Sequence, residues 1–172
     1  MNKKNHKKRN TAVFIDSENI SSKKASDIMR EAKKRGVVDR VNAYGIQKDK
    51  STQSWAKVAR ETEGMKDIRL YGGPGKNKVD QKIKKDMMNV VKSDSNIDIV
   101  VLAASDHGYA PDVEKLRAMG KRVIVIGEEK APASLRNAVV NLFRCEIFIN
   151  ATPSCFPSHD FTCIIKRETN YT

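Results

Sequence analysis

The chain has 172 residues, of which 39% are hydrophobic, and a formal net charge of +12 at pH 7. This length suits one domain with a substantial core rather than two domains. No apolar run approaches the roughly 20 residues of a membrane span, and no apolar segment follows the basic N-terminus as it would in a signal peptide, so we expect a cytoplasmic protein with no membrane partner.

The positive charge is unevenly distributed along the chain. Residues 1–10 contain five basic residues and no acid, whereas the acids and bases of residues 151–172 balance. The remaining excess lies on residues 11–150, and a basic folded region favours a polyanion such as RNA, or single-stranded DNA, over a small acidic ligand. The three cysteines lack Cys-x-x-Cys spacing, which indicates reduced thiols rather than a zinc site or a disulfide framework.

The predicted elements alternate between strand and helix. Residues 11–15 are an apolar run that ends at Asp16, which indicates a buried strand. Helix formers then run to Gly36 and predict a helix over 22–36. The later elements are a strand over 38–46, a helix over 50–63, a strand over 68–71, a Gly-rich loop over 72–78, a helix over 79–92, a strand over 97–104, a helix over 111–119, a strand over 122–126, a helix over 132–141 and a strand over 143–149.

This alternation predicts a three-layer α/β/α fold with a mainly parallel sheet of five or six strands. The domain is expected over 11–150, preceded by a disordered basic arm over 1–10. A tail or extension containing Pro and Ser follows over 151–172, in which 161–165 is a candidate for an added strand. The sequence does not set the oligomeric state, and a homo-oligomer stays among the alternatives.

Two carboxylates follow the two most apolar strands. Asp16 ends the first strand, and Asp106 follows the strand over 97–104. Ligands and chemistry gather at the carboxyl ends of parallel strands, so both side chains are candidates for one site. The alternative is that each aspartate only caps the helix that follows it.

Two further carboxylates lie on the predicted helix over 79–92. At 100° per residue Asp80 falls within the apolar arc, where a charge is costly unless it is paired, hydrogen-bonded or bound to a metal. Asp86 lies on the opposite rim of this arc, about 9 Å along the helix axis, so the two can border one cavity without occupying equivalent positions in it. The alternatives are ion pairs at i±4, with Lys84 for Asp80 and with Lys82 for Asp86.

Carboxylates without a convergent His or Cys are typical of a site for magnesium or manganese. Beside positive charge, such a site indicates hydrolysis of phosphodiester bonds, because metal ions activate water and stabilise the leaving oxygen. Lys76, Lys78 and Lys82 lie in or just after the Gly-rich loop and are predicted to bind the flanking phosphates. The alternative for these lysines is a solvated helix face.

Three segments, over 13–20, 78–86 and 99–109, carry these acids. Together they resemble the three signatures of the NYN domain family, which belongs to the PIN-like nucleases. The resemblance covers roughly residues 11–149 and implies a PIN-like fold and a ribonuclease that depends on Mg²⁺ or Mn²⁺. By position, it implies that Asp16, Asp80 and Asp106 bind metal and carry the catalysis, that Asp86 is a further metal-binding acid, and that Asn19 lies beside the scissile phosphate.

The third segment departs from the family pattern. The family usually has Ser-Gly-Asp-Ser-Asp-Phe where this chain has Ala-Ser-Asp-His-Gly-Tyr over 104–109. Gly108 therefore replaces a second carboxylate, and Tyr109 replaces an apolar aromatic residue that is expected to form a wall of the pocket. The missing acid motivates a second hypothesis, an RNA-binding or regulatory module with weak or no hydrolytic activity.

Overall fold

The computed structural model describes residues 8–47, 50–71, 77–127 and 145–148. The elements are β1 (Asn10–Asp16), the short 3₁₀ helix η1 (Ser22–Lys24), α1 (Ala25–Arg35), β2 (Val37–Ile46), α2 (Lys50–Glu61), β3 (Met65–Leu70), α3 (Lys78–Ser93), β4 (Ile97–Ala103), the 3₁₀ helix η2 (His107–Tyr109), α4 (Ala110–Ala118), β5 (Arg122–Ile126) and β6 (Cys145–Phe148). The predicted helix over 132–141, the tail over 151–172, residues 1–7 of the basic arm and Lys76 lie outside the described residues.

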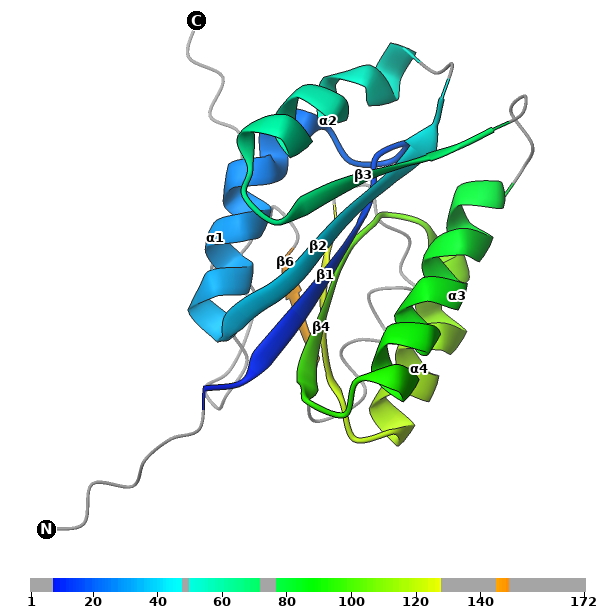
Figure 1. The fold of residues 1–172 in the computed structure, drawn as a ribbon. Helices are drawn as coiled ribbons and strands as arrows, with labels where there is room; N and C mark the ends of the chain where they lie inside the picture. The colour runs from blue at the N-terminus through cyan, green and yellow to red at the C-terminus, as the bar shows by residue number, and fades with distance from the viewer. Residues whose placement is uncertain (1–7, 48–49, 72–76, 128–144, 149–172) are drawn as a thin grey trace, which may run out of the picture.

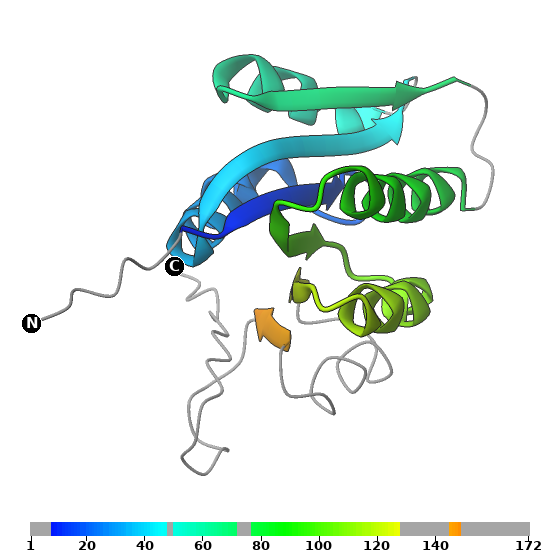
Figure 2. The same cartoon turned by 60° about the horizontal axis from the view of Figure 1, so that its bottom comes forward.

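Six strands form one sheet in the order β3-β2-β1-β4-β5-β6, and every neighbouring pair is parallel. Helices α1 and α2 cover one face of this sheet and α3 and α4 cover the other (Figures 1 and 2). The predicted three-layer α/β/α fold is confirmed. Strand β3 begins at Met65, three residues earlier than the sequence predicts, because it pairs with β2 from that residue onward.

The central strands are buried because helices cover them on both sides. Alternate residues of β1 enter two cores: Phe14 packs with α3 and α4, whereas Val13 and Ile15 pack with α1 and α2. All three side chains are fully buried. Continuous apolar runs without polar alternation are therefore what this architecture requires of β1 and β4.

The connections reverse direction beside β1. From β1 the chain passes outward through β2 to β3, and α3 then carries it across the other face to β4, on the opposite side of β1. In open α/β sheets this reversal leaves a crevice at the carboxyl ends of the two central strands, where ligands bind. Asp16 ends β1 and Asp106 follows β4 at this edge, which we call the carboxyl edge.

Within the described residues, none of the helices combines the length and the apolar character that crossing a membrane requires.

Candidate functional site

Asp16 is a fully buried carboxylate at the end of β1. Its Oδ1 accepts hydrogen bonds from the backbone N–H groups of Glu18 at 3.0 Å and Asn19 at 3.3 Å, and its Oδ2 accepts one from Asn19 Nδ2 at 2.7 Å. The turn after β1 therefore wraps around this side chain. The residue that caps the next helical segment is Ser21, whose side chain accepts a hydrogen bond from the Lys23 N–H, so helix capping does not account for Asp16.

Tyr109 joins Asp16 to Asp80. Its hydroxyl lies 3.1 Å from Asp16 Oδ2 and 2.7 Å from Asp80 Oδ1. A phenolic hydroxyl has one proton, so it can donate to only one of these two oxygens at a time. Both carboxylates therefore lie within hydrogen-bond distance of the same hydroxyl oxygen, and one of the two carboxylate oxygens receives no proton from it.

Burial dominates the electrostatics of this cluster. It raises the pKa of Asp16 above its ordinary value of 3.8, and the hydrogen bond from Asn19 lowers it in part. The negative charge of Asp80 raises the Asp16 pKa further. Burial, with the charge of Asp16 next in size, also raises the pKa of Tyr109, so this hydroxyl keeps its proton at neutral pH. Two carboxylates that repel each other in a buried setting favour the binding of a cation.

Asp80 lies in the first turn of α3 and is half-buried, on the side where Val79 and Ile83 are buried. The predicted alternative, an ion pair with Lys84, is not formed among the described residues. Lys84 Nζ instead lies 3.9 Å from Asp112 Oδ2 and 5.3 Å from the centre of the Tyr109 ring. Asp80 therefore contacts the cluster at the carboxyl edge rather than a neighbour on its own helix.

Asp86 belongs to a separate polar network on α3. Its Oδ1 forms the alternative ion pair with Lys82 at 2.8 Å, and its Oδ2 accepts a hydrogen bond from the Tyr44 hydroxyl at 3.1 Å. Asn42 Nδ2 donates in turn to that hydroxyl at 3.0 Å. Burial raises the pKa of Tyr44, and the charge of Asp86 raises it further, so Tyr44 is a donor here. These contacts connect α3 to β2.

Asp106 is half-buried beyond the end of β4. Its Oδ1 accepts a hydrogen bond from the Gly108 N–H at 2.8 Å, which stabilises the short helix η2 that carries Tyr109. A Cβ atom at Gly108 would lie 3.4 Å from Lys84 Nζ and 3.5 Å from Asp106 Oδ1. The acid of the family pattern, if present at this position, would therefore project beside Lys84 and Asp106.

The structure brings Asp16, Asp80 and Asn19 together, and it places Asp86 in the separate network with Lys82. Among the described residues, no three His, Cys, Asp or Glu side chains form a group that could hold one metal ion. Lys78 is exposed at the start of α3.

Two tyrosine hydroxyls that hydrogen-bond to the carboxylates are not predicted by the sequence patterns. For Tyr109 the signal is the replacement of the family's phenylalanine, which adds a hydroxyl at a core position. No comparable signal marks Tyr44, because its partner Asp86 lies 42 residues further along the chain.

Comparisons with known proteins bear on the family and the fold. The family model of the NYN domain matches residues 10–144. The crystal structure of a protein of unknown function from Vibrio parahaemolyticus is similar with a TM-score of 0.61 and 18% sequence identity, covering 85% of this chain and 94% of that chain, which shows a shared fold. No curated protein matches the sequence. Since the NYN model matches well over half of the chain, the protein belongs to the NYN domain family of PIN-like nucleases.

Proposed function

We propose that this protein is a metal-dependent ribonuclease that hydrolyses RNA phosphodiester bonds at the carboxyl edge of its sheet. The observation that carries the proposal is the meeting of Asp16 and Asp80 at the Tyr109 hydroxyl. Burying a charged residue at the end of a central strand costs free energy, which a bound cation would offset. The family of PIN-like nucleases to which the chain belongs supports RNA as the substrate.

The residues at this edge fit a hard divalent cation. Their donors are carboxylate oxygens, and Mg²⁺ commonly binds through one or two carboxylates together with water and substrate phosphates. The mutual repulsion of Asp16 and Asp80 supports the same assignment, because a cation between them offsets it. We assign Asp16 and Asp80 as the main ligands of Mg²⁺ or Mn²⁺ and Asp106 as a third acid at the rim. Asp86 is the fourth proposed ligand, and it would have to exchange its ion pair with Lys82 for the cation.

When bound, the cation supplies an activated water and stabilises the leaving oxygen. The chain's own groups do the remaining work. Asn19 holds the Asp16 carboxylate in one orientation through its 2.7 Å hydrogen bond. It is also proposed to contact the scissile phosphate. Lys78, Lys82 and the loop residue Lys76 are proposed to bind the flanking phosphates, and the site is proposed to operate in the cytoplasm.

A second candidate function is RNA binding without efficient hydrolysis. It is favoured by Gly108, which removes a carboxylate from the family pattern, and by the Tyr109 hydroxyl, which lies between Asp16 and Asp80. In this alternative the same basic surface binds RNA and regulates it without cutting.

Cleavage by the full chain separates the two candidates. Labelled single-stranded RNA, structured RNA and single-stranded DNA are incubated with Mn²⁺, Mg²⁺ or EDTA. We expect metal-dependent cleavage of RNA that falls at least about 100-fold in Asp16→Asn and in Asp80→Asn, because several kcal/mol of charge stabilisation are lost. Asp39→Asn is the matched control, since Asp39 is an exposed carboxylate paired with Arg40 and remote from the carboxyl edge.

The outcomes are distinct. RNA that is bound but stays intact in every metal supports the second candidate. Cleavage that persists in EDTA, or that Asp39→Asn reduces as much as Asp16→Asn does, contradicts the proposed metal site.

A further inference from the structure

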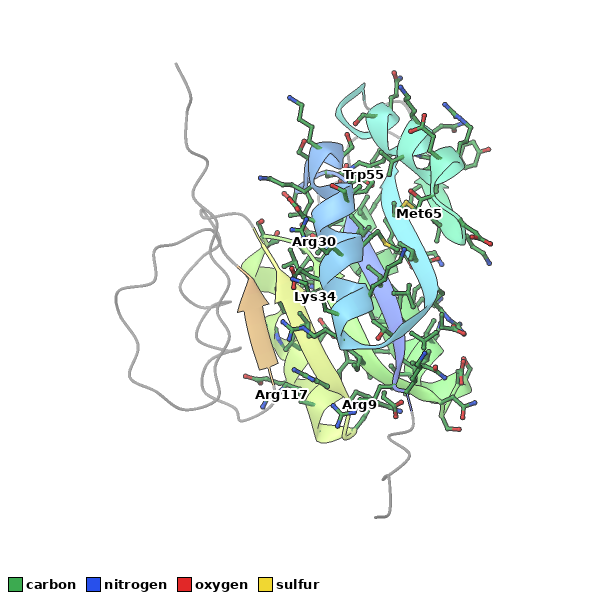
Figure 3. All side chains as sticks on the ribbon, turned by 90° about the vertical axis from the view of Figure 1, so that its left-hand side faces the viewer. Arg9, Arg30, Lys34, Trp55, Met65 and Arg117 are labelled. Carbon is green, nitrogen blue, oxygen red and sulfur yellow. The ribbon has the colours of Figure 1, made fainter. Side chains whose placement is uncertain are left out.

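A basic pocket lies at the amino edge of the sheet, the edge opposite the carboxyl edge. It has a volume of about 450 Å³ and is lined by Lys8, Arg9, Lys33, Lys34, Arg35, Gly36 and Val37. These residues come from the segment that enters β1 and from the last turn of α1 with the start of β2. Figure 3 looks onto α1, with Lys34 on that helix and Arg9 at the same end of the sheet.

Gly36 allows the two segments to meet. The Val37 N–H donates a hydrogen bond to the Arg9 carbonyl at 2.8 Å, so the entering chain lies directly against the connection between α1 and β2. A Cβ atom at Gly36 would lie only 2.2 Å from that carbonyl oxygen and 2.9 Å from Thr11 Oγ1. Any residue with a side chain would therefore force the backbone apart here. The close approach that Gly36 allows places Lys8 and Arg9 beside the basic end of α1.

The pocket holds a concentrated positive charge. Five of its seven lining residues are cationic, and Lys8, Arg9 and Lys33 are exposed. Glu31 offsets part of this charge, because its Oε1 lies 2.8 Å from Lys34 Nζ and its Oε2 lies 4.0 Å from Arg35. Basic residues in the last turn of a helix also interact favourably with its dipole. That effect explains Lys33 and Lys34 but not the two cations that a different segment adds to the same pocket.

We propose that this pocket is a second RNA-binding site, which holds the phosphate backbone at a distance from the cutting edge. Val37 is its one apolar lining residue, so the pocket suits a chain of phosphates better than a small molecule with an apolar body. Strand β1 separates Arg9 from Asp16 by about 23 Å at ~3.3 Å per residue. At the stacked spacing of ~3.4 Å per nucleotide in one strand, this distance corresponds to about seven nucleotides of RNA.

This inference rests on the proposed function for the identity of its ligand, and RNA binding in EDTA tests it without requiring cleavage. The variant is Arg9→Ala/Lys33→Ala, which removes two exposed cations. Its control is Lys57→Ala/Arg60→Ala, which removes one lysine and one arginine from the exposed face of α2. The probe is a fluorescent 24-nucleotide oligouridine, and its affinity is measured by anisotropy across a salt series. Thermal unfolding first checks that every variant unfolds at the same temperature as the parent protein.

We expect the pocket variant to bind about tenfold more weakly at low salt. The slope of log K against log salt, which is negative, should become shallower by about 1.4, which corresponds to ~0.7 for each lost phosphate contact. The control should change the affinity by less than about twofold and leave the salt slope unchanged. Equal losses in the two variants, an unchanged salt slope in the pocket variant, or a parent protein that does not bind the oligouridine would each overturn the proposal.

Cleavage in Mn²⁺ provides an independent readout. If the protein is a nuclease, the pocket variant should raise KM for a long RNA and leave kcat and the cleavage of a hexanucleotide unchanged. Absence of cleavage in the parent protein contradicts the proposed nuclease but not the second site, whose test is binding in EDTA.

Discussion

Asp16 is a residue of the candidate site whose burial costs the fold stability. It is fully buried, and its raised pKa means that its ionised form is less favourable in the folded than in the unfolded chain. Three hydrogen bonds from Asn19 and Glu18 compensate in part. A residue that costs stability without its ligand is typical of functional sites, where stability and activity trade against each other.

The pH dependence of the free energy of unfolding tests whether ionised Asp16 destabilises the fold. In metal-free protein, Asp16 lowers the free energy of unfolding as pH rises from its ordinary pKa of 3.8 through its raised folded pKa, because ionisation then favours the unfolded chain. We therefore expect Asp16→Asn to gain stability relative to the parent across this window and to keep the gain at neutral pH. Urea denaturation in EDTA between pH 4 and 8 measures this difference, with Asp39→Asn as the charge control. A neutral-pH loss of stability specific to Asp16→Asn would contradict the expectation.

Tyr109 is the second residue whose contribution can be isolated. Tyr109→Phe deletes the hydroxyl that lies between Asp16 and Asp80 and restores the aromatic residue of the family pattern. Because a hydrogen bond to a charged acceptor is lost, we expect the metal-free variant to be about 2 kcal/mol less stable. We also expect Mn²⁺ to raise the unfolding temperature of this variant more than that of the parent. Without the hydroxyl, the repulsion between Asp16 and Asp80 is larger, and a bound cation relieves it.

The matched control for Tyr109→Phe is Tyr71→Phe, because Tyr71 is 81% exposed. Thermal unfolding with and without Mn²⁺ compares the two variants. If they have the same stability in EDTA, the hydroxyl does not hold the two acids together.

At the scale of elements, helix α2 contacts the turn that follows Asp16. Trp55 on α2 is fully buried, and its Nε1–H donates a hydrogen bond to the Ile20 carbonyl at 2.8 Å. The Ile20 N–H donates to the Asp16 carbonyl at 2.9 Å. Helix α2 therefore supports the turn that carries the candidate site.

Trp55→Phe tests this support. It leaves the Ile20 carbonyl without its donor and creates a cavity, so we expect a loss of about 2–4 kcal/mol and a lower affinity for Mn²⁺. Met65→Leu is the control, because it changes a buried residue of the same core with little change in volume and is expected to cost less than about 1.5 kcal/mol. Chemical denaturation and Mn²⁺ titration measure the two effects. Normal Mn²⁺ affinity in a destabilised Trp55→Phe would show that α2 stabilises the core but does not position the site.

At the scale of the whole molecule, the formal charge is +12, and we propose that two groups of its basic residues bind RNA. One is the start of α3 at the carboxyl edge, where Lys78 and Lys82 lie, and the other is the basic pocket at the amino edge. Because the two sets share no residue and lie at opposite ends of the sheet, their contributions to RNA binding should be additive.

The double variant Lys78→Ala/Lys82→Ala tests the carboxyl edge. We expect it to weaken RNA binding in EDTA and to make the negative slope of log K against log salt shallower by about 1.4, because each phosphate contact releases counterions. Combining it with Arg9→Ala/Lys33→Ala should multiply the two losses in affinity. Anisotropy across a salt series measures both, with Lys57→Ala/Arg60→Ala as the control. A salt slope equal to that of the control would remove Lys78 and Lys82 from the interface.

The sequence by itself determined the layers of the fold and the acids at its edge. Apolar runs that end in Asp16 and Asp106 are a local signal, because a strand buried on both faces needs continuous apolar residues. Helical periodicity similarly placed Asp80 on the inner side of α3. The described strands and helices confirm this alternation of elements. Three segments of residues were enough to identify the family.

Only the tertiary structure decided which groups touch. The Tyr109 hydroxyl contacts Asp16, although the two residues are 93 positions apart in the sequence. Asp86 contacts Tyr44 and Lys82 and does not join the cluster of Asp16 and Asp80. The basic pocket likewise depends on the close approach of Arg9 to Gly36. Periodicity determines the face of an element on which a side chain lies, but hydrogen bonds depend on ångström-scale distances between elements, and these are set by packing across the whole sheet.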